Sequence, residues 1–160
     1  MSLIEIYTDG SSRGNPGPGG FGVVMSYKGN EKEISQGFRK TTNNRMELLA
    51  VIVAIESLKT PKIPVKVYSD SKYVIDSITK GWLDSWIVKR FKGKKNQDLW
   101  MRLDELSKFH NVNWKWVKGH AGNTFNERCD ALVHEAIDAG KFIEDSGYLA
   151  QQAQDPELFG

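Results

Sequence analysis

Short runs of alternating hydrophobic and polar residues recur along this chain, and such alternation predicts β-strands. We expect five strands, at residues 3–7, 21–27, 33–38, 65–69 and 112–117. Turn residues at 28–30 separate the second run from the third, so these two runs are expected to pair as a hairpin. In the fifth run Trp114 and Trp116 lie on one face, which favours a core position for both.

Helical spacing of apolar residues lies between and after these runs. From Met46 onward the apolar residues recur every three or four positions, with Asn43 or Asn44 placed to cap the helix. Further helices are expected at about residues 71–78, 97–108 and 125–138, the last one ending at Gly140. Because strands and helices are interspersed, the expected fold class is α/β.

Length and composition fit one globular domain. The chain has 160 residues, 39% of them hydrophobic and 26% charged, which excludes a disordered chain. Its longest uncharged apolar stretch, residues 48–55, is far shorter than the roughly 20 residues that cross a bilayer. We expect a domain over residues 1–149 and a polar, flexible tail at 150–160. Since the chain opens without a basic and apolar leader, we expect a cytoplasmic protein with no membrane contact.

Positive charge is concentrated in one segment. Residues 80–95 hold six basic side chains and one acid, although the whole chain carries a net charge of only +2. Trp82 and Trp86 are interleaved with these basic residues. Basic groups neutralise phosphates and aromatic rings pack against sugars or bases, so the segment is typical of a polyanion-binding surface. A solvated charge run anchored by core tryptophans is the alternative.

Four acids occur at the ends of elements or among apolar residues, namely Asp9, Glu47, Asp70 and Asp130. Each has a structural explanation when taken alone: a turn at Asp9, a helix N-terminus at Glu47, a helix cap at Asp70 and a solvated side chain at Asp130.

Their placement in the sheet favours a shared role. If the first and fourth strands are parallel neighbours, Asp9 and Asp70 emerge side by side at the edge where α/β sheets bind ligands. Clustered carboxylates repel one another unless they take up protons or bind a cation. Hard oxygen ligands suit Mg²⁺ or Mn²⁺, and two such ions can clamp the attacking and leaving oxygens of a phosphoryl displacement. The acids therefore suggest a nuclease.

Five ordered motifs resemble the type 1 ribonuclease H family, most closely its bacterial members. They are YTDGSSRGNPGPGG at 7–20, TTNNRMEL at 41–48, SDSKY at 69–73, WVKGHAG at 116–122 and NERCD at 126–130. The resemblance covers about residues 3–148. It implies a ribonuclease H-like fold, with a five-stranded mixed sheet of three antiparallel and two parallel strands flanked by helices.

The resemblance also implies an activity and its residues. The activity is endonucleolytic hydrolysis of the RNA strand of RNA–DNA hybrids, giving 5′-phosphate and 3′-hydroxyl ends, by a monomer that uses two Mg²⁺ ions or Mn²⁺ as a substitute. Asp9, Glu47, Asp70 and Asp130 match the family's metal ligands. His120 matches a mobile loop histidine that assists proton transfer or product departure, and its alternative is an ordinary surface residue.

Substrate contacts follow from the same resemblance. Ser12, Asn15, Asn43 and Asn44 match residues that line the minor groove, where RNA displays its 2′-hydroxyls. Thr42 and Asn96 match positions that hold a phosphate of the DNA strand, and Trp82, Trp86, Lys89 and Arg90 belong to the basic protrusion at 80–95. Lys72 departs from the family pattern because many relatives have glutamine there, so a hydrogen bond would become a charge contact.

Two other functions remain open. The chain could be a non-catalytic module that binds hybrids, although a pure binder gains nothing from clustered acids that face phosphates. It could also be a nuclease of the same superfold that acts on DNA. The asparagines expected to read 2′-hydroxyls, together with the basic segment, favour the RNA-cleaving branch.

Overall fold

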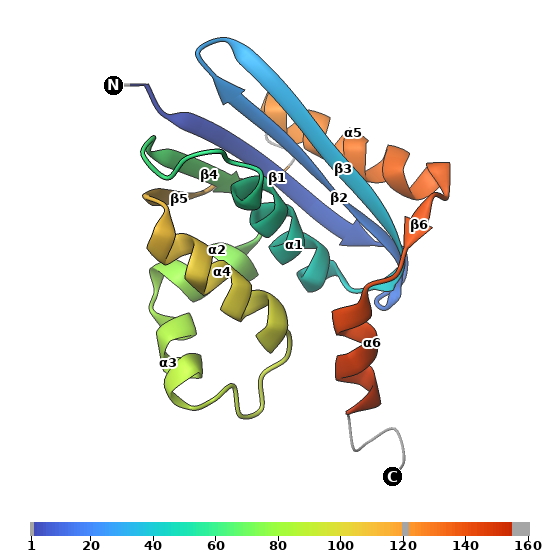
Figure 1. The fold of residues 1–160 in the computed structure, drawn as a ribbon. Helices are drawn as coiled ribbons and strands as arrows, with labels where there is room; N and C mark the ends of the chain where they lie inside the picture. The colour runs from blue at the N-terminus through green and yellow to red at the C-terminus, as the bar shows by residue number, and fades with distance from the viewer. Residues whose placement is uncertain (1, 120–121, 155–160) are drawn as a thin grey trace.

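A computed structural model describes residues 2–119 and 122–154. It contains one six-stranded mixed sheet in the order β5-β4-β1-β2-β3-β6 (Figure 1). The strands are β1 (Ile4–Ser12), β2 (Gly17–Tyr27), β3 (Asn30–Thr41), β4 (Val65–Ser69), β5 (Val112–Trp116) and β6 (Phe142–Ile143). β1, β2 and β3 are antiparallel, whereas β4 runs parallel to β1, β5 parallel to β4, and β6 parallel to β3.

Helices cover both faces of the sheet (Figure 1). They are α1 (Asn43–Glu56), α2 (Lys72–Thr79), α3 (Trp82–Val88), α4 (Gln97–Phe109), α5 (Thr124–Ala139) and α6 (Ser146–Ala153). On one face α1 packs on β1 and β2 and contacts α4, while α2 packs on β4 and β5. On the other face α5 covers β1, β2 and β3. Within residues 2–119 and 122–154, no helix has both the length and the apolar character needed to cross a bilayer.

The main core lies between the sheet and α1. Ten of the 14 residues of α1 are buried, so this helix is apolar around most of its circumference and fills the centre of the domain. The indole of Trp100, on α4, is fully buried beside it. Because most of the α1 surface is buried, a polar side chain that α1 carries near the sheet has a fixed position.

The α/β class and the five expected strands are confirmed, but the sheet has a sixth strand. β6 pairs with Gly37 and Phe38 of β3. It is two residues long, too short for alternation to reveal it. The first strand is also longer than expected, because β1 continues beyond Asp9 to Ser12 in pairing with β2. Asp9 therefore lies within the strand and does not close it.

Two further expectations need correction. Thr42, not Asn43 or Asn44, caps α1, since its side chain accepts a hydrogen bond from the backbone N–H of Arg45. Trp116 is 38% exposed although alternation favoured a core position, because it lies at the end of β5. Trp114 packs against the core as expected.

The segment after residue 149 begins as a helix. α6 starts after Asp145, whose side chain accepts a hydrogen bond from the backbone N–H of Tyr148, and it ends at Ala153. Residues 150–153, the first part of the segment expected to be a flexible tail, thus form the end of this helix, and residues 155–160 lie outside the described part of the chain. Gly140 ends α5 in the left-handed conformation, as expected from its position.

Candidate active site

Three acids meet at the centre of the sheet edge. β1 and β4 are parallel, and their register aligns Tyr7 with Tyr68, which leaves Asp9 and Asp70 two residues further along neighbouring strands. Glu47 reaches the same place from α1. One carboxylate oxygen from each of the three acids lies within 4.8 Å of the other two. The expected convergence of these residues is thus present in the structure.

Gly10 allows α1 to approach β1 closely enough for this convergence. A Cβ atom at Gly10 would lie 2.6 Å from the backbone nitrogen of Glu47 and still closer to the carbonyl carbon of Met46. Real Cβ atoms essentially never approach backbone atoms so closely. A residue without a side chain is therefore required where the strand passes the helix that carries Glu47.

Replacing Gly10 with alanine is expected to force β1 and α1 apart and to separate Glu47 from Asp9. We expect a loss of roughly 2–3 kcal/mol of unfolding free energy from the overpacked contact, with at least tenfold weaker Mn²⁺ binding. Chemical denaturation and calorimetry measure the two effects. The neighbouring Ser11→Ala change is the matched control and should alter neither; unchanged Mn²⁺ binding in Gly10→Ala would contradict this role for Gly10.

Burial and mutual repulsion disfavour the charged forms of these acids. Burial, together with the charges of Asp70 and Asp130, raises the pKa of Asp9 to about 7. Burial and the charges of Asp9 and Asp70 raise the pKa of Glu47 well above its ordinary value. Among the described residues no group hydrogen-bonds the buried Oε1 atom of Glu47. An unpaired buried oxygen within an acid cluster fits the donor set of a divalent cation.

The raised pKa values make the stability of the metal-free protein depend on pH. Asp9 titrates near 3.8 when unfolded and near 7 when folded, so the folded state binds the extra proton and stability falls as pH rises through this window. In EDTA we expect a melting temperature on the order of 5 °C lower at pH 8 than at pH 5. Millimolar Mg²⁺ at pH 8 should reverse the loss, and Asp9→Asn should flatten the profile. A melting temperature that increases over this range in EDTA would contradict the assignment.

Asp130 lies beside this cluster on α5. It lines a small cavity together with Asp9 and Asp70, and its charge is one of the causes that raise the pKa of Asp9. Its side chain is 41% exposed, and it is not part of the tight three-acid group. The Nε2 atom of His134 is 3.5 Å from its Oδ1 atom. The fourth expected acid is therefore at the rim of the site.

Asn126 is a site residue that the sequence analysis left without a role. It lines the same cavity, and its buried Oδ1 atom has no hydrogen-bond partner among the described residues. The Asn123 cap explains its position, because the Asn123 side chain accepts hydrogen bonds from the backbone N–H groups of Phe125 and Asn126. The 126–130 motif contained the signal, but the neutral amide of Asn126 gave no reason to assign it a role beside the carboxylate of Asp130.

The end of β5 and the loop that follows it contact Asp70. The indole Nε1 of Trp116 donates a hydrogen bond to the backbone oxygen of Asp70 over 3.0 Å. The backbone of Gly119 lies so close that a Cβ there would be 2.7 Å from Asp70 Oδ2. His120, expected in this loop, lies outside the described residues.

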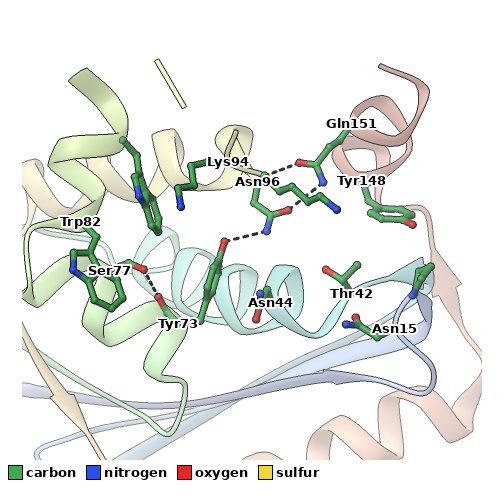
Figure 2. A pocket seen from close by; sticks show the side chains of 13 residues that line it. Asn15, Thr42, Asn44, Tyr73, Ser77, Trp82, Lys94, Asn96, Tyr148 and Gln151 are labelled. Carbon is green, nitrogen blue, oxygen red and sulfur yellow. Dashed lines mark hydrogen bonds between the residues drawn. The ribbon is translucent and has the colours of Figure 1, made fainter. Parts of the chain in front are cut away.

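A groove of about 500 Å³ lies beside the start of α1 (Figure 2). Of the expected contact residues, Asn15, Thr42, Asn44, Trp82, Trp86 and Asn96 line it. Its lining also includes Lys94 and Lys95 of the basic segment, together with Tyr73, Tyr148 and Gln151, which had no assigned role. The groove thus extends from the start of α1 to the basic segment. Glu47 lies on the same helix, further from its start.

The other expected contact residues, namely Ser12, Asn43, Lys72, Lys89 and Arg90, do not line this groove. Ser12 and Asn15 are joined through Asn43: Asn43 Oδ1 accepts from the backbone N–H of Ser12 over 2.7 Å, and the N–H of Asn43 donates to Asn15 Oδ1 over 2.9 Å. Lys72 begins α2, with its Nζ 5.1 Å from the centre of the Trp116 ring. Lys89 and Arg90 are exposed beyond α3 and do not line the groove.

Fold and site define the class of protein: an α/β domain that can bind metal through acids from β1, from the end of β4 and from α1. The RNase H family model matches residues 2–138. The chain therefore belongs to the ribonuclease H family, and it is a nuclease of the bacterial type 1 branch.

Known proteins resemble the whole chain. A ribonuclease H of Shewanella halifaxensis is 55% identical over 158 residues, which span 96% of this chain and 98% of the relative. The crystal structure of LC9-RNase H1, a type 1 RNase H, has a TM-score of 0.77 at 31% identity and covers 98% of this chain and 83% of that one. LC11-RNase H1, crystallised in complex with an RNA/DNA hybrid, has a TM-score of 0.67 at 30% identity. The match covers 86% of this chain and 98% of LC11-RNase H1.

Proposed function

We propose that this protein is an endonuclease that hydrolyses the RNA strand of RNA–DNA hybrids with two divalent metal ions, leaving 5′-phosphate and 3′-hydroxyl ends. The observation that carries the proposal is the convergence of Asp9, Glu47 and Asp70 within 4.8 Å. The family relationship supports it, as does the hybrid bound to LC11-RNase H1.

The acids fit Mg²⁺, with Mn²⁺ as a substitute. Asp9, Glu47 and Asp70 would hold the ions as hard oxygen ligands, and Asp130 would complete the set from the rim. When bound, a pair of divalent ions stabilises the charge that develops on the attacking and leaving oxygens of the phosphodiester. A bound cation would give the Oε1 atom of Glu47 a partner and would lower the raised pKa of Asp9.

The protein's own groups position the site and its substrate. The largely buried helix α1 and the paired strands β1 and β4 fix the carboxylates before substrate arrives, which removes a reorganisation cost from the reaction. Trp116 fixes the backbone oxygen of Asp70. By resemblance to the family, His120 would assist proton transfer to the departing oxygen or the release of product.

Polar groups near α1 suit recognition of the hybrid. Asn43 and Asn44 are exposed in the first turn of α1, and Ser12 and Asn15 adjoin them at the end of β1. Such neutral donors and acceptors can exchange hydrogen bonds with 2′-hydroxyls, which distinguish RNA from DNA. By the family resemblance we assign Thr42 and Asn96 to a phosphate of the DNA strand, and both line the adjoining groove with Trp82 and Trp86 of the basic segment.

Substrate and metal dependence test the proposed function. Labelled RNA–DNA hybrid, double-stranded RNA and double-stranded DNA are incubated with the protein in Mg²⁺ or in EDTA. We expect cleavage only of the RNA strand of the hybrid and only with metal, and end analysis should find 5′-phosphates. Binding of the hybrid without cleavage would favour the non-catalytic module, and cleavage of double-stranded DNA would favour the DNA-acting nuclease.

The basic segment is expected to supply affinity without chemistry. Replacing Lys89, Arg90, Lys92, Lys94 and Lys95 with glutamine removes up to five cations that can pair with phosphates. The slope of log affinity against log salt should fall by about 0.9 for each phosphate that is no longer neutralised. Binding by fluorescence anisotropy measures this, and Mn²⁺ affinity, measured separately, should stay unchanged. An unchanged salt slope would reassign the segment to a structural role.

We also propose that the protein acts as a monomer in the cytoplasm. The monomeric state follows from the family resemblance. Sedimentation at micromolar concentration tests it and should give the mass of one 18.1 kDa chain.

A further inference from the structure

The C-terminal helix α6 is fixed to the domain at its start. The Asp145 carboxylate is buried and accepts from Thr41 Oγ1 over 2.7 Å and from Arg45 Nε over 2.8 Å. Both partners precede it by about a hundred residues. Tyr148, one turn into α6, is also buried. The helix therefore has a defined place beside the groove, and its residues can act on whatever the groove binds.

Gln151 reaches from α6 to the start of α4 (Figure 2). Its Oε1 atom accepts a hydrogen bond from the backbone N–H of Asn96 over 2.6 Å, and its Nε2 atom lies 3.4 Å from Asn96 Oδ1. Asn96 is the N-cap of α4, but its own side chain makes no capping hydrogen bond. It also has a left-handed backbone, with φ of 67°, which is uncommon for non-glycine residues although asparagine adopts it more readily than most.

The Asn96 side chain links this contact to the floor of the groove. Its Nδ2 atom donates to the Tyr73 hydroxyl over 3.1 Å, and the same hydroxyl accepts from Trp100 Nε1 over 2.9 Å. Arg45 Nη1 donates to Asn96 Oδ1 over 3.3 Å. The hydrogen bonds of this network converge on Asn96. Gln151 is its member from α6, and it accepts a hydrogen bond from the Asn96 backbone.

The groove next to Gln151 has the chemistry of a site for a nucleic-acid strand. Among the described residues, its lining contains Lys94 and Lys95 and no acidic side chain. Aromatic rings of Tyr73, Trp82 and Trp86 lie along it, and neutral amides and hydroxyls supply the remaining polar groups. Positive charge together with aromatic and amide groups suits a sugar–phosphate backbone.

We propose that α6 is a wall of the substrate groove and that Gln151 is a positioning residue, which holds Asn96 in the conformation that lets the groove bind one strand of the hybrid. The inference rests on the proposed function, since it takes the hybrid as the ligand. It adds a segment beyond residue 149 to the binding site. Gln151 acts through Asn96, so its loss should weaken binding and leave the chemistry at the metal site intact.

Gln151→Ala tests this, with Gln152→Ala as the matched control because Gln152 is the adjacent glutamine of α6 and does not line the groove. Dissociation constants for a hybrid are measured in EDTA by fluorescence anisotropy, and cleavage kinetics in Mg²⁺. For Gln151→Ala we expect Kd and KM to rise roughly fivefold to tenfold with kcat within about twofold of the parent. Gln152→Ala should match the parent in all three.

A second variant separates positioning from folding. Gln151→Glu keeps an acceptor for the N–H of Asn96 but places a negative charge in the groove, so its melting temperature should match that of the parent while Kd rises and depends less steeply on salt. If both Gln151 variants bind the hybrid like Gln152→Ala, or if they lower kcat at unchanged KM, the role of Gln151 is overturned. Failure of the unaltered protein to cut the hybrid would instead overturn the proposed function, and this inference with it.

Discussion

Asp70→Asn is expected to reduce cleavage of the hybrid by at least about three orders of magnitude. The change preserves the shape of the side chain but removes one of the three carboxylate charges that converge within 4.8 Å. The metal site stabilises charge that develops in the transition state. Losing the carboxylate of Asp70 therefore lowers kcat more than it lowers the affinity for substrate. Binding of the hybrid in EDTA should remain within about threefold of the parent.

Single-turnover cleavage in Mg²⁺ and anisotropy in EDTA measure the two quantities separately. Asp76→Asn is the matched control, because Asp76 lies on α2 and pairs with Lys80 rather than with the acid cluster. It should retain full activity. Activity of Asp70→Asn close to that of the parent would remove Asp70 from the proposed ligand set.

Arg45→Ala is expected to destabilise the fold by about 3–5 kcal/mol, the usual cost of leaving a buried ionic group without its partner. The Arg45 side chain is 1% exposed and pairs with Asp98 and Asp145 over 2.8 Å each. These bonds connect α1 with α4 and with the start of α6. The buried Asp145 carboxylate would lose a charged partner, which is the main source of the cost.

Chemical denaturation measures the change. Arg102→Ala offers a comparison, since Arg102 pairs with Glu56 at the surface, where such pairs contribute roughly 0–1 kcal/mol. A loss below about 1.5 kcal/mol in Arg45→Ala would mean that α6 is held chiefly by other contacts. That result would also weaken the case for α6 as a fixed wall of the groove.

The sequence predicted the central part of the fold because its signals are local. The alternation at residues 65–69 and the apolar spacing from Met46 onward correspond closely to β4 and α1. Two of the parts that it missed depend on distant partners. β6 exists through pairing with β3, and α6 starts at a carboxylate whose partners, Thr41 and Arg45, come about a hundred residues earlier.

The same distinction applies to the site. Asp9 and Asp70 could be placed together from the sequence, because parallel neighbouring strands bring their ends to one edge. Nothing local to Gln151 indicates that it contacts Asn96, since a glutamine in a polar C-terminal segment is typical of a solvated tail. The need for glycine at position 10 also comes from the approach of a helix that is remote in sequence.

The central claim is that Asp9, Glu47 and Asp70, with Asp130 at the rim, hold a pair of divalent ions. A crystal structure of the protein soaked in Mn²⁺, with anomalous scattering to locate the metal, tests it most directly. Two anomalous peaks coordinated by these carboxylates are the expected result. Saturating Mn²⁺ with no peak among the four acids would contradict the account, whatever the enzyme then proved to cleave.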